Sequence, residues 1–170
     1  MIKLRRTDPK RDAIRLHEVM GDEASCRYLS HPPFETVAGT QAQLEAWVGL
    51  APDHDWAITS SGDDAAIGRV TIYEKENGLF EIGIIICPDA RGKGVALNAC
   101  QKAIDAVDKS DQPRRIMADI DPENLASLRL FERLGFHREG VLRANWQTHI
   151  GVRDSVIMSL VAADLRPWRV

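Results

Sequence analysis

The stretch Leu79–Cys87 constrains the fold more than any other part of the sequence. Its side chains are apolar at alternate positions on both faces of an extended chain: Phe80, Ile82, Ile84 and Ile86 on one face, and Leu79, Ile85 and Cys87 on the other. A strand of this kind is typical of the middle of a sheet that is covered on both sides. Its longest continuous apolar run, Ile82–Cys87, has six residues, whereas a membrane-spanning helix needs about 20. We therefore expect no bilayer crossing.

Apolar periodicity divides the rest of the chain into helices and strands. We expect further strands at Ile2–Arg6, Trp56–Ser60, Ala66–Tyr73, Arg115–Ile120, Phe136–Leu142 and Gln147–Leu160. We expect helices that begin at Asp8-Pro9, near Val37, at Gly94 and at Asp121-Pro122. Asp followed by Pro supplies an N-cap and a first helical residue, and Gly135 is suited to end the last helix after Leu134. This order predicts a mixed α/β (α+β) fold around one sheet. Since no linker or repeat divides the 170 residues, we predict a single domain over residues 1–170.

Composition excludes several classes of protein. The chain has 22 basic and 25 acidic residues and a net charge of −3, which gives no overall positive field for nucleic acid. Its three cysteines form no CxxC pair, so we expect free thiols and a reducing, cytoplasmic setting. Its five histidines have no HxH or HxxxH spacing, so we expect no metal site. The start, Met1–Arg6, lacks the apolar segment of a secretory signal.

The segment Pro88–Ala96, between the apolar strand and a helix, carries the strongest chemical signal. Gly92 and Gly94 let the backbone approach a ligand, the helix start leaves N–H groups unpaired, and Arg91 and Lys93 add positive charge. These features predict a site for a phosphate or pyrophosphate. The spacing is not that of a P-loop, because Gly94 follows Lys93, and a dinucleotide fingerprint would need a third glycine. Taken alone, the segment could also be an ordinary basic turn.

Two motifs in order resemble one enzyme superfamily. Arg91–Ala96 matches the R-x-x-G-x-G/A motif of the GNAT superfamily of acyl-CoA-dependent N-acetyltransferases, and Ile86-Cys87-Pro88 is similar to the strand end that introduces it. The stretches Asn124–Ser127, Leu130–Phe136 and Glu139–Arg143 resemble the second half of that family, most closely its ribosomal-protein alanine N-acetyltransferase (RimJ/RimL-like) branch. The resemblance implies a GNAT fold, a mostly antiparallel mixed sheet of about six or seven strands flanked by about four helices.

The resemblance also implies how acetyl-CoA is held. The coenzyme pyrophosphate should bind the backbone of six consecutive residues, Arg91, Gly92, Lys93, Gly94, Val95 and Ala96. A splayed strand end should bind the pantetheine arm, and by position the amide of Ile86 should polarise the thioester carbonyl. Asn124 should contact the pantetheine. It shares a predicted helix face with Ser127 and Phe131, at spacings i, i+3 and i+7, although such a stripe could also be a solvated face.

Two candidate catalytic residues follow. Many GNATs use a tyrosine as the general acid where this chain has Phe131, which has no proton to give. Ser127 is then the expected donor to the departing thiolate, with bound water as the alternative. Glu81 is the one acidic residue in the apolar strand, and burying an unpaired carboxylate is costly. By resemblance we expect it to act as the base through water, or else to be a structural residue that is paired with an arginine at the strand edge.

The acceptor is less constrained. An α-amine has a pKa near 8 and a lysine amine a pKa near 10.4, so an α-amine is more easily used in its neutral form. We expect direct transfer of acetyl to a primary amine, such as a protein N-terminus, without a cysteine intermediate. A small amine (polyamine, aminoglycoside or amino acid) and a non-catalytic acyl-CoA-binding module are the alternatives. Ser30–Phe34 and Trp146–His149 are candidate walls of the acceptor pocket. A homodimer is an expected assembly, since dimers are common in the family.

Overall fold

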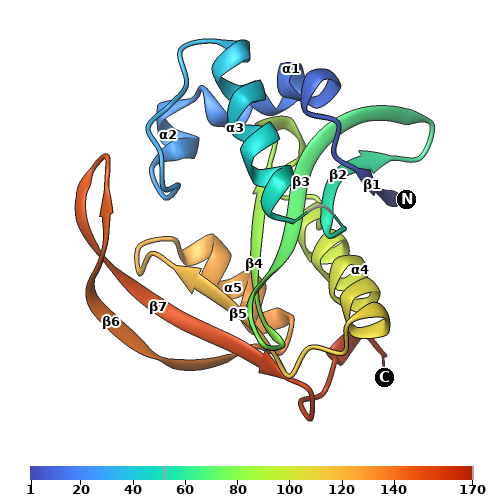
Figure 1. Ribbon diagram of the computed structural model, residues 1–170, viewed down its shortest axis with the longest axis vertical. Coiled ribbons are helices and arrows are strands. Elements are labelled where there is room, and N and C mark those ends of the chain that lie inside the picture. Colours follow the sequence, from blue (N-terminus) through green and yellow to red (C-terminus); the bar gives the residue numbers. More distant parts are fainter. Residues whose placement is uncertain (52, 170) are drawn as a thin grey trace.

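Seven strands form one mixed sheet in the computed structural model, which describes residues 1–51 and 53–169 (Figure 1). Their order across the sheet is β1-β2-β3-β4-β5-β7-β6. Neighbouring strands are antiparallel except for β4 and β5, which are parallel. The strands are β1 (Ile2–Arg6), β2 (Asp55–Ser60), β3 (Asp63–Glu76), β4 (Leu79–Ile86), β5 (Arg115–Ile120), β6 (His137–Thr148) and β7 (Gly151–Val161). The expected mixed α/β sheet and the central position of β4 are confirmed.

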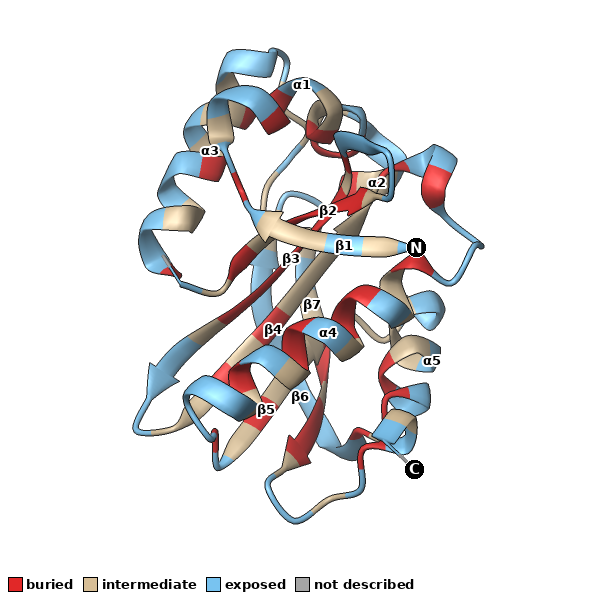
Figure 2. Ribbon diagram, turned by 90° about the vertical axis from the view of Figure 1, so that its right-hand side faces the viewer, coloured by how far each residue is buried: buried red, intermediate tan, exposed pale blue. Residues whose placement is uncertain are grey.

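Helices cover the two faces of the sheet. They are α1 (Pro9–Met20), α2 (Glu23–Cys26), α3 (Val37–Leu50), α4 (Val95–Ser110) and α5 (Leu125–Arg133), with 3-10 turns η1 (Pro88–Ala90) and η2 (Pro167–Arg169). The short α2 is absent from the sequence prediction. In α1 and α3, Leu16, Met20 and Leu44 pack on one face. The buried stripe of α4 turns toward the other face (Figure 2). None of the helices in the described part of the chain is long and apolar enough to span a membrane.

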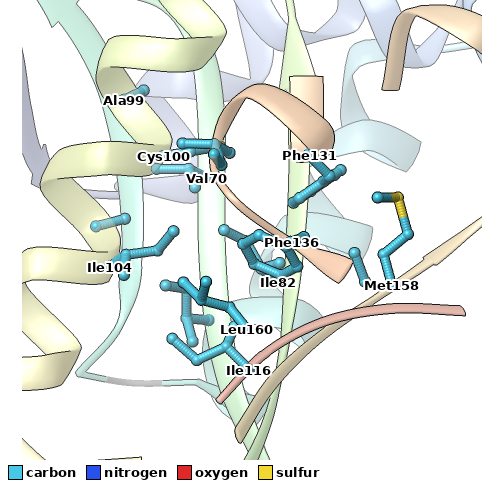
Figure 3. Packing of buried hydrophobic residues seen from close by; sticks show 14 of the residues in the cluster. Val70, Ile82, Ala99, Cys100, Ile104, Ile116, Phe131, Phe136, Met158 and Leu160 are labelled. Atoms are coloured by element: carbon cyan, nitrogen blue, oxygen red, sulfur yellow. The ribbon is translucent and has the colours of Figure 1, made fainter. Parts of the chain in front are cut away.

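The larger core lies between the sheet and the helices α4 and α5 (Figure 3). Even-numbered residues of the middle of β3, of β4 and of β5 point into it, among them Val70, Ile82 and Ile116. Phe131 of α5 contacts Phe136 edge-on, with ring centroids 5.0 Å apart and an interplanar angle of 67°. Because even-numbered residues fill this core, the odd-numbered residues of the same strands face α1 and α3.

One predicted helix start is confirmed and another is wrong. Asp8 caps α1 through its side chain, as expected before Pro9. Asp121-Pro122 instead forms a turn, in which the Asp121 carbonyl accepts the N–H of Asn124 at 2.9 Å. The Asp121 carboxylate accepts the Glu123 N–H at 2.8 Å and two hydrogen bonds from Arg153, at 2.7 and 3.0 Å, so it closes a turn and also binds β7. Asn124 is the actual N-cap of α5, where its side chain accepts the Ser127 N–H at 3.2 Å.

The closing strands are longer than predicted and reverse at a different place. The prediction put a break between Leu142 and Gln147, but β6 runs on to Thr148 and the chain turns before Gly151. Most of β6 is exposed, so it carries no burial pattern that would mark it as a strand. A register shift lies between Leu142 and Trp146, and Ala144 has a φ of +51°. This irregularity interrupts the alternation on which the prediction depended.

Beyond its middle, β4 separates from β5, which corrects the expectation that β4 is fully covered. The two strands pair only from Leu79–Arg115 to Glu81–Met117. Phe80 and Ile82 are buried, whereas residues 83–86 are half-buried. The half-exposed end of β4 faces the opening between the strands, and this opening positions the candidate site.

Candidate active site

The separation of β4 from β5 leaves backbone amides of β4 without a strand partner. Cys87 N–H donates to the Ile67 carbonyl of β3 at 3.0 Å. Hydrogen-bonded pairs alternate along antiparallel strands, so Ile85 and Gly83 also point their polar groups toward β3. The N–H groups of Ile84 and Ile86, beyond the last residues that pair with β5, consequently face the opening. An extended ligand arm laid there would find donors at every second residue.

The loop after β4 is built to receive an anion. Gly92 and Gly94 have φ values of +73° and +72°, which residues with a Cβ rarely adopt. Gly94 begins α4 without a side-chain cap, so the first N–H groups of the helix remain available to a ligand. Aligned helix dipoles favour negative charge at this end. The predicted phosphate site therefore has the backbone geometry that its chemistry requires.

The two basic side chains of this loop support the loop itself. Arg91 Nε donates to the Ile86 carbonyl at 3.0 Å, and its Nη2 donates to Ser25 Oγ at 2.8 Å. Lys93 Nζ donates to the Asp89 carbonyl at 2.8 Å. Arg91 thereby fastens the loop to the end of β4 and to α2, while its charge stays close to the anion site.

A cavity of about 650 Å³ runs from this loop along the opening toward α5. The predicted coenzyme-binding residues that line it are Ile86, Arg91, Gly92, Gly94, Val95, Ala96 and Asn124, together with Ser127. Lys93 and Glu81 are outside this lining. Phe131 also borders the cavity, so the predicted stripe of Asn124, Ser127 and Phe131 does face a cavity.

A second cavity, of about 350 Å³, lies on the face of the sheet that carries α3. Its lining includes Trp47 of α3, Thr71 and Tyr73 of β3, Glu81 of β4 and Trp146 of β6. Both predicted walls contribute to this lining: Ser30 from the first, and Trp146 and Thr148 from the second. The two cavities share a boundary made by Tyr28, Leu29, Ile82, Gly83, Ile84, Ile85, Asp119 and Asp121. A group transferred from one cavity to the other would have to pass this boundary.

Glu81 lines the second cavity and already has partners. Its Oε2 accepts a hydrogen bond from Lys75 Nζ at 2.8 Å, and its side chain is 16% exposed. The hydroxyl of Tyr73 lies beside it. Burial raises the pKa of Tyr73, and the charge of Glu81 and a hydrogen bond to it act in the same direction. Glu81 therefore lines the cavity, as expected of a base, and also forms an ion pair, as expected of a structural residue, although its partner is a lysine and not an arginine.

Asp119 is a candidate that the sequence analysis missed. Its Oδ2 accepts hydrogen bonds from Trp146 Nε1 at 2.7 Å and from Asn145 Nδ2 at 3.2 Å. It borders both cavities, on the same face of the sheet as Glu81. One signal could have found it: in Arg115–Ile120 the apolar residues Ile116, Ala118 and Ile120 alternate, and Asp119 is the acidic residue on the opposite face.

An ion-pair network closes one side of the boundary. Arg153 of β7 binds both Asp121 and Glu123, and Arg27 also binds Glu123 at 3.0 Å. Burial acts to raise the pKa of Asp121, but its hydrogen bonds with Arg153 and the Glu123 backbone prevail and lower it. Hydrogen bonds from Arg153 and Arg27 likewise lower the pKa of Glu123. Asp121 is thus held as a carboxylate that is committed to Arg153.

Sequence relatives include several acetyltransferases. YjcK of Bacillus subtilis, a probable N-acetyltransferase, is 30% identical over 66% of this chain and 64% of its own length. The spermidine N(1)-acetyltransferase of Escherichia coli K12 is 21% identical over 94% of this chain and 85% of its own length. The ribosomal protein uS5-alanine N-acetyltransferase of that organism is 33% identical over 52% of this chain and 45% of its own length. The chain therefore spans less than two thirds of YjcK and of the uS5 enzyme.

Solved structures share the fold. An acetyltransferase (GNAT family) from Bacillus anthracis superposes with a TM-score of 0.84 at 23% identity, over 95% of both chains. Spermidine N-acetyltransferase from Vibrio cholerae, in complex with CoA and spermine, gives 0.78 at 21% identity, over 95% of this chain and 96% of that one. The expected GNAT fold is confirmed, with seven strands and with five α-helices where about four were expected. A family profile described as an acetyltransferase (GNAT) domain matches residues 2–137, and the chain belongs to this family.

Proposed function

We propose that this chain is an acetyl-CoA-dependent N-acetyltransferase that moves acetyl directly to a primary amine. The observation that carries the proposal is the meeting of two cavities at the opening between β4 and β5. One cavity ends in an anion-binding loop, and the other is lined by aromatic and acidic side chains. A donor with a pyrophosphate tail and an acceptor with an amine can approach each other from the two sides.

Acetyl-CoA would lie in the larger cavity. Its pyrophosphate would bind the backbone of residues 91–96, and its pantetheine arm would lie along the inward amides of β4, with Asn124 beside it. The thioester has to reach the boundary of the two cavities. Ile84 lies on that boundary, whereas Ile86 lines the larger cavity alone. We therefore assign the carbonyl-polarising amide to Ile84, two residues before the predicted Ile86, and leave the Ile86 amide to the pantetheine arm.

The leaving thiolate needs a proton. Ser127 borders the coenzyme cavity and is our proposed donor, directly or through a bound water. A cysteine intermediate is not required. Cys26, Cys87 and Cys100 are buried, and burial raises the pKa of Cys87 to about 11. A thiol of this kind is a poor nucleophile near neutral pH, which favours direct transfer from the coenzyme to the amine.

The acceptor is a primary amine of one of two kinds. The α-amine of a protein N-terminus is the first candidate, because it is the more easily deprotonated amine and because a uS5-alanine acetyltransferase is among the relatives. A small polyamine is the second candidate, since carboxylates line the acceptor cavity and a spermidine acetyltransferase matches over more of the chain. The RimJ/RimL-like branch is therefore one proposal of two.

Residues beyond 137 belong to the proposed catalytic domain. The family profile ends at residue 137, but residues 156–161 of β7 pair with the whole length of β5, and β7 separates β5 from β6. Trp146 and Arg153 of this hairpin line the acceptor cavity. Both observations support one domain over residues 1–170.

Thiol release from acetyl-CoA tests the proposal. The acceptor panel contains peptides that begin with Ala, Ser or Met, together with spermidine, an aminoglycoside and free amino acids, and mass spectrometry identifies the acetylated product. We expect acetylation of at least one primary amine. Acetylation of a polyamine alone would replace the protein acceptor. No turnover with any amine, while CoA still raises the melting temperature, would refute catalysis and favour an acyl-CoA-binding module.

A further inference from the structure

We propose that Asp119 is the carboxylate that binds the ammonium group of the acceptor and accepts its proton as the new C–N bond forms. The inference rests on the proposed function and names a residue for its central step. Glu81, the base predicted from the sequence, is then left with the role of an ion-pair partner in the wall of the acceptor cavity.

Position is the first argument. Among the residues that border both cavities, three are titratable: Tyr28, Asp119 and Asp121. The hydroxyl of Tyr28 donates to the Glu123 carbonyl at 3.3 Å. Asp121 is bound by the guanidinium of Arg153 through two hydrogen bonds. Asp119 is therefore the one acidic group of this boundary that is not committed to a cation.

The hydrogen bonds of Asp119 orient it and leave it an unused oxygen. Trp146 Nε1 and Asn145 Nδ2 both donate to Oδ2. Oδ1 has no donor among residues 1–51 and 53–169. Both donors are neutral, so they hold the carboxylate in place without neutralising its charge. An ammonium group carries three N–H donors and a positive charge, and it would complete this half-satisfied carboxylate.

The basic groups around Asp119 are paired with other carboxylates. Arg153 and Arg27 bind the acidic groups of the β5–α5 turn, Lys75 binds Glu81, and Arg69 binds Asp55. Within the described ranges no ion pair includes Asp119. A half-buried carboxylate without a counter-ion attracts a cation more strongly than one on an open surface, because water screens it less.

Glu81 is less suited to take the proton. It lies opposite Met117, at the last residue pair before β4 and β5 separate. Asp119 is two residues further along β5, where the strands have opened and Ile84 reaches the boundary. The Oε2 of Glu81 is also already occupied by the Lys75 ammonium, which donates to it at 2.8 Å. The nucleophile therefore has to meet the thioester closer to Asp119 than to Glu81.

The proton balance is complete with the groups named. The acceptor arrives as R–NH3⁺ with its cation at Asp119. The amine nitrogen attacks the thioester carbonyl carbon as one proton passes to the Asp119 carboxylate, and the carbonyl oxygen takes the negative charge. The intermediate then collapses and the C–S bond breaks. As the amide forms, the second nitrogen proton reaches the departing thiolate through Ser127 or water, so that Ser127 ends with its own proton restored. Asp119 then releases the first proton to solvent, and the products are the amide, the CoA thiol and one H⁺.

Steady-state kinetics of three variants test the assignment. Asp119→Asn keeps the size of the side chain and an oxygen that can accept from Trp146. Glu81→Gln removes the other carboxylate. Glu132→Gln removes an exposed carboxylate of α5, outside both cavities, and is the matched control. At pH 7 we expect Asp119→Asn to lower kcat/KM by about 100-fold or more, and Glu81→Gln by less than about tenfold. The control should match the wild type, and the Kd for CoA should be unchanged in all three.

The pH profile separates proton transfer from a structural role. Between about pH 6 and 8, an enzyme that binds the ammonium and removes its proton has a kcat/KM nearly independent of pH. Without the carboxylate, the neutral amine has to bind, so kcat/KM of Asp119→Asn should rise about tenfold per pH unit below the pKa of the acceptor amine. The charged and titratable groups that line the acceptor cavity together with Asp119 are Arg27, Tyr28, Arg69, Tyr73, Glu81, Asp121, Arg153 and Asp154. Glu81→Gln should keep the flat profile.

Each outcome decides the proposal. Wild-type turnover together with an Asp119→Asn variant within twofold of it, or with a flat profile, would overturn the role of Asp119. A loss in Glu81→Gln that shows the rising profile would restore Glu81 as the base. If Asp119→Asn does not fold, Asp119→Ser supplies the same comparison with a smaller acceptor group. Absence of wild-type turnover with every amine would refute the proposed function itself, and this inference with it.

Discussion

The buried ion pair between Arg69 and Asp55 supports the acceptor cavity, and Arg69→Met should destabilise the fold strongly. Arg69 Nε donates to Asp55 Oδ1 at 2.9 Å, and its Nη2 donates to Oδ2. The two side chains are 7% and 1% exposed. Removing one partner from a buried pair leaves an uncompensated charge and costs about 3–5 kcal/mol. Because Thr7 Oγ1 still donates to Asp55 at 2.6 Å, we expect the lower part of this range from the charge itself.

A second contact of Arg69 adds to the stability that Arg69→Met would lose. The Arg69 guanidinium lies over the ring of Trp47, 4.6 Å from its centroid. Loss of a cation–π contact of this kind adds about 1 kcal/mol, so the total is about 4 kcal/mol. For a domain whose free energy of unfolding is about 5–15 kcal/mol, this is a large fraction. With an m-value of about 2 kcal/mol/M, the urea midpoint should fall by about 2 M.

Urea unfolding followed by far-UV circular dichroism measures the effect. The matched control is Arg6→Met, because Arg6 and Asp53 form an ion pair at 2.8 Å with side chains that are 64% and 74% exposed. Its midpoint should not move measurably. Asp55→Asn combined with Arg69→Met should recover part of the loss, since no charge is then left buried. Equal midpoints for Arg69→Met and Arg6→Met would refute the reasoning that burial decides the value of the pair.

Three further predictions concern the two cavities. Gly83→Val should raise the KM for the acceptor at least tenfold and leave the Kd for CoA unchanged. A Cβ at Gly83 meets Thr71 Cγ2 at an ordinary 3.5 Å and extends toward the acceptor cavity. Steady-state kinetics and CoA titration measure the two constants, and equal losses in both would contradict the prediction. Trp146→Phe should raise the KM for the acceptor with little change in the melting temperature, because it removes the Nε1 donor to Asp119 and keeps an aromatic side chain in the cavity wall. An unchanged KM would show that this donor does not position Asp119. Burial raises the pKa of Cys87 to about 11, so its reactive thiolate is a small fraction at pH 8 and grows about tenfold per pH unit as pH rises toward 11. The alkylation rate of Cys87, followed by mass spectrometry, should rise with this slope. Fast alkylation at pH 8 with a parallel loss of activity would contradict both the burial of Cys87 and direct acetyl transfer.

The sequence predicted a strand or a helix end correctly where residues close together in the chain determine it. The apolar β4 and the strand Arg115–Ile120 have clear burial patterns, and both are found where predicted. Asp8 and Gly135 were identified because a cap or a positive φ depends on single residue types. Asp121-Pro122 shows the opposite case. The same dipeptide that starts a helix at Asp8-Pro9 forms a turn here, in which the Asp121 carboxylate accepts the Glu123 N–H and binds Arg153, and Asn124 caps the helix instead.

The coenzyme side was more predictable than the acceptor side for a physical reason. The anion loop uses backbone groups of consecutive residues, so glycine spacing and a helix start reveal it. The acceptor cavity draws single side chains from α3, β3, β4, β5, β6 and β7, and no local pattern joins Glu81, Asp119 and Trp146. Asp119 was overlooked because its importance depends on where β5 parts from β4. That separation is a property of the whole sheet.

Strand β4 borders both cavities, one through its backbone amides and the other through its side chains. The amides of Ile84 and Ile86 face the opening that would hold the coenzyme arm, whereas Glu81 and Ile85 place their side chains on the face of the acceptor cavity, which Gly83 also lines. Backbone amides are the same for every residue except proline. Substitutions at the odd-numbered positions can therefore change the shape and charge of the acceptor cavity and leave the coenzyme hydrogen bonds in place. We therefore expect the determinants of acceptor choice to lie on the α3 face of β3, β4 and β5, where substitutions leave the proposed coenzyme hydrogen bonds unchanged.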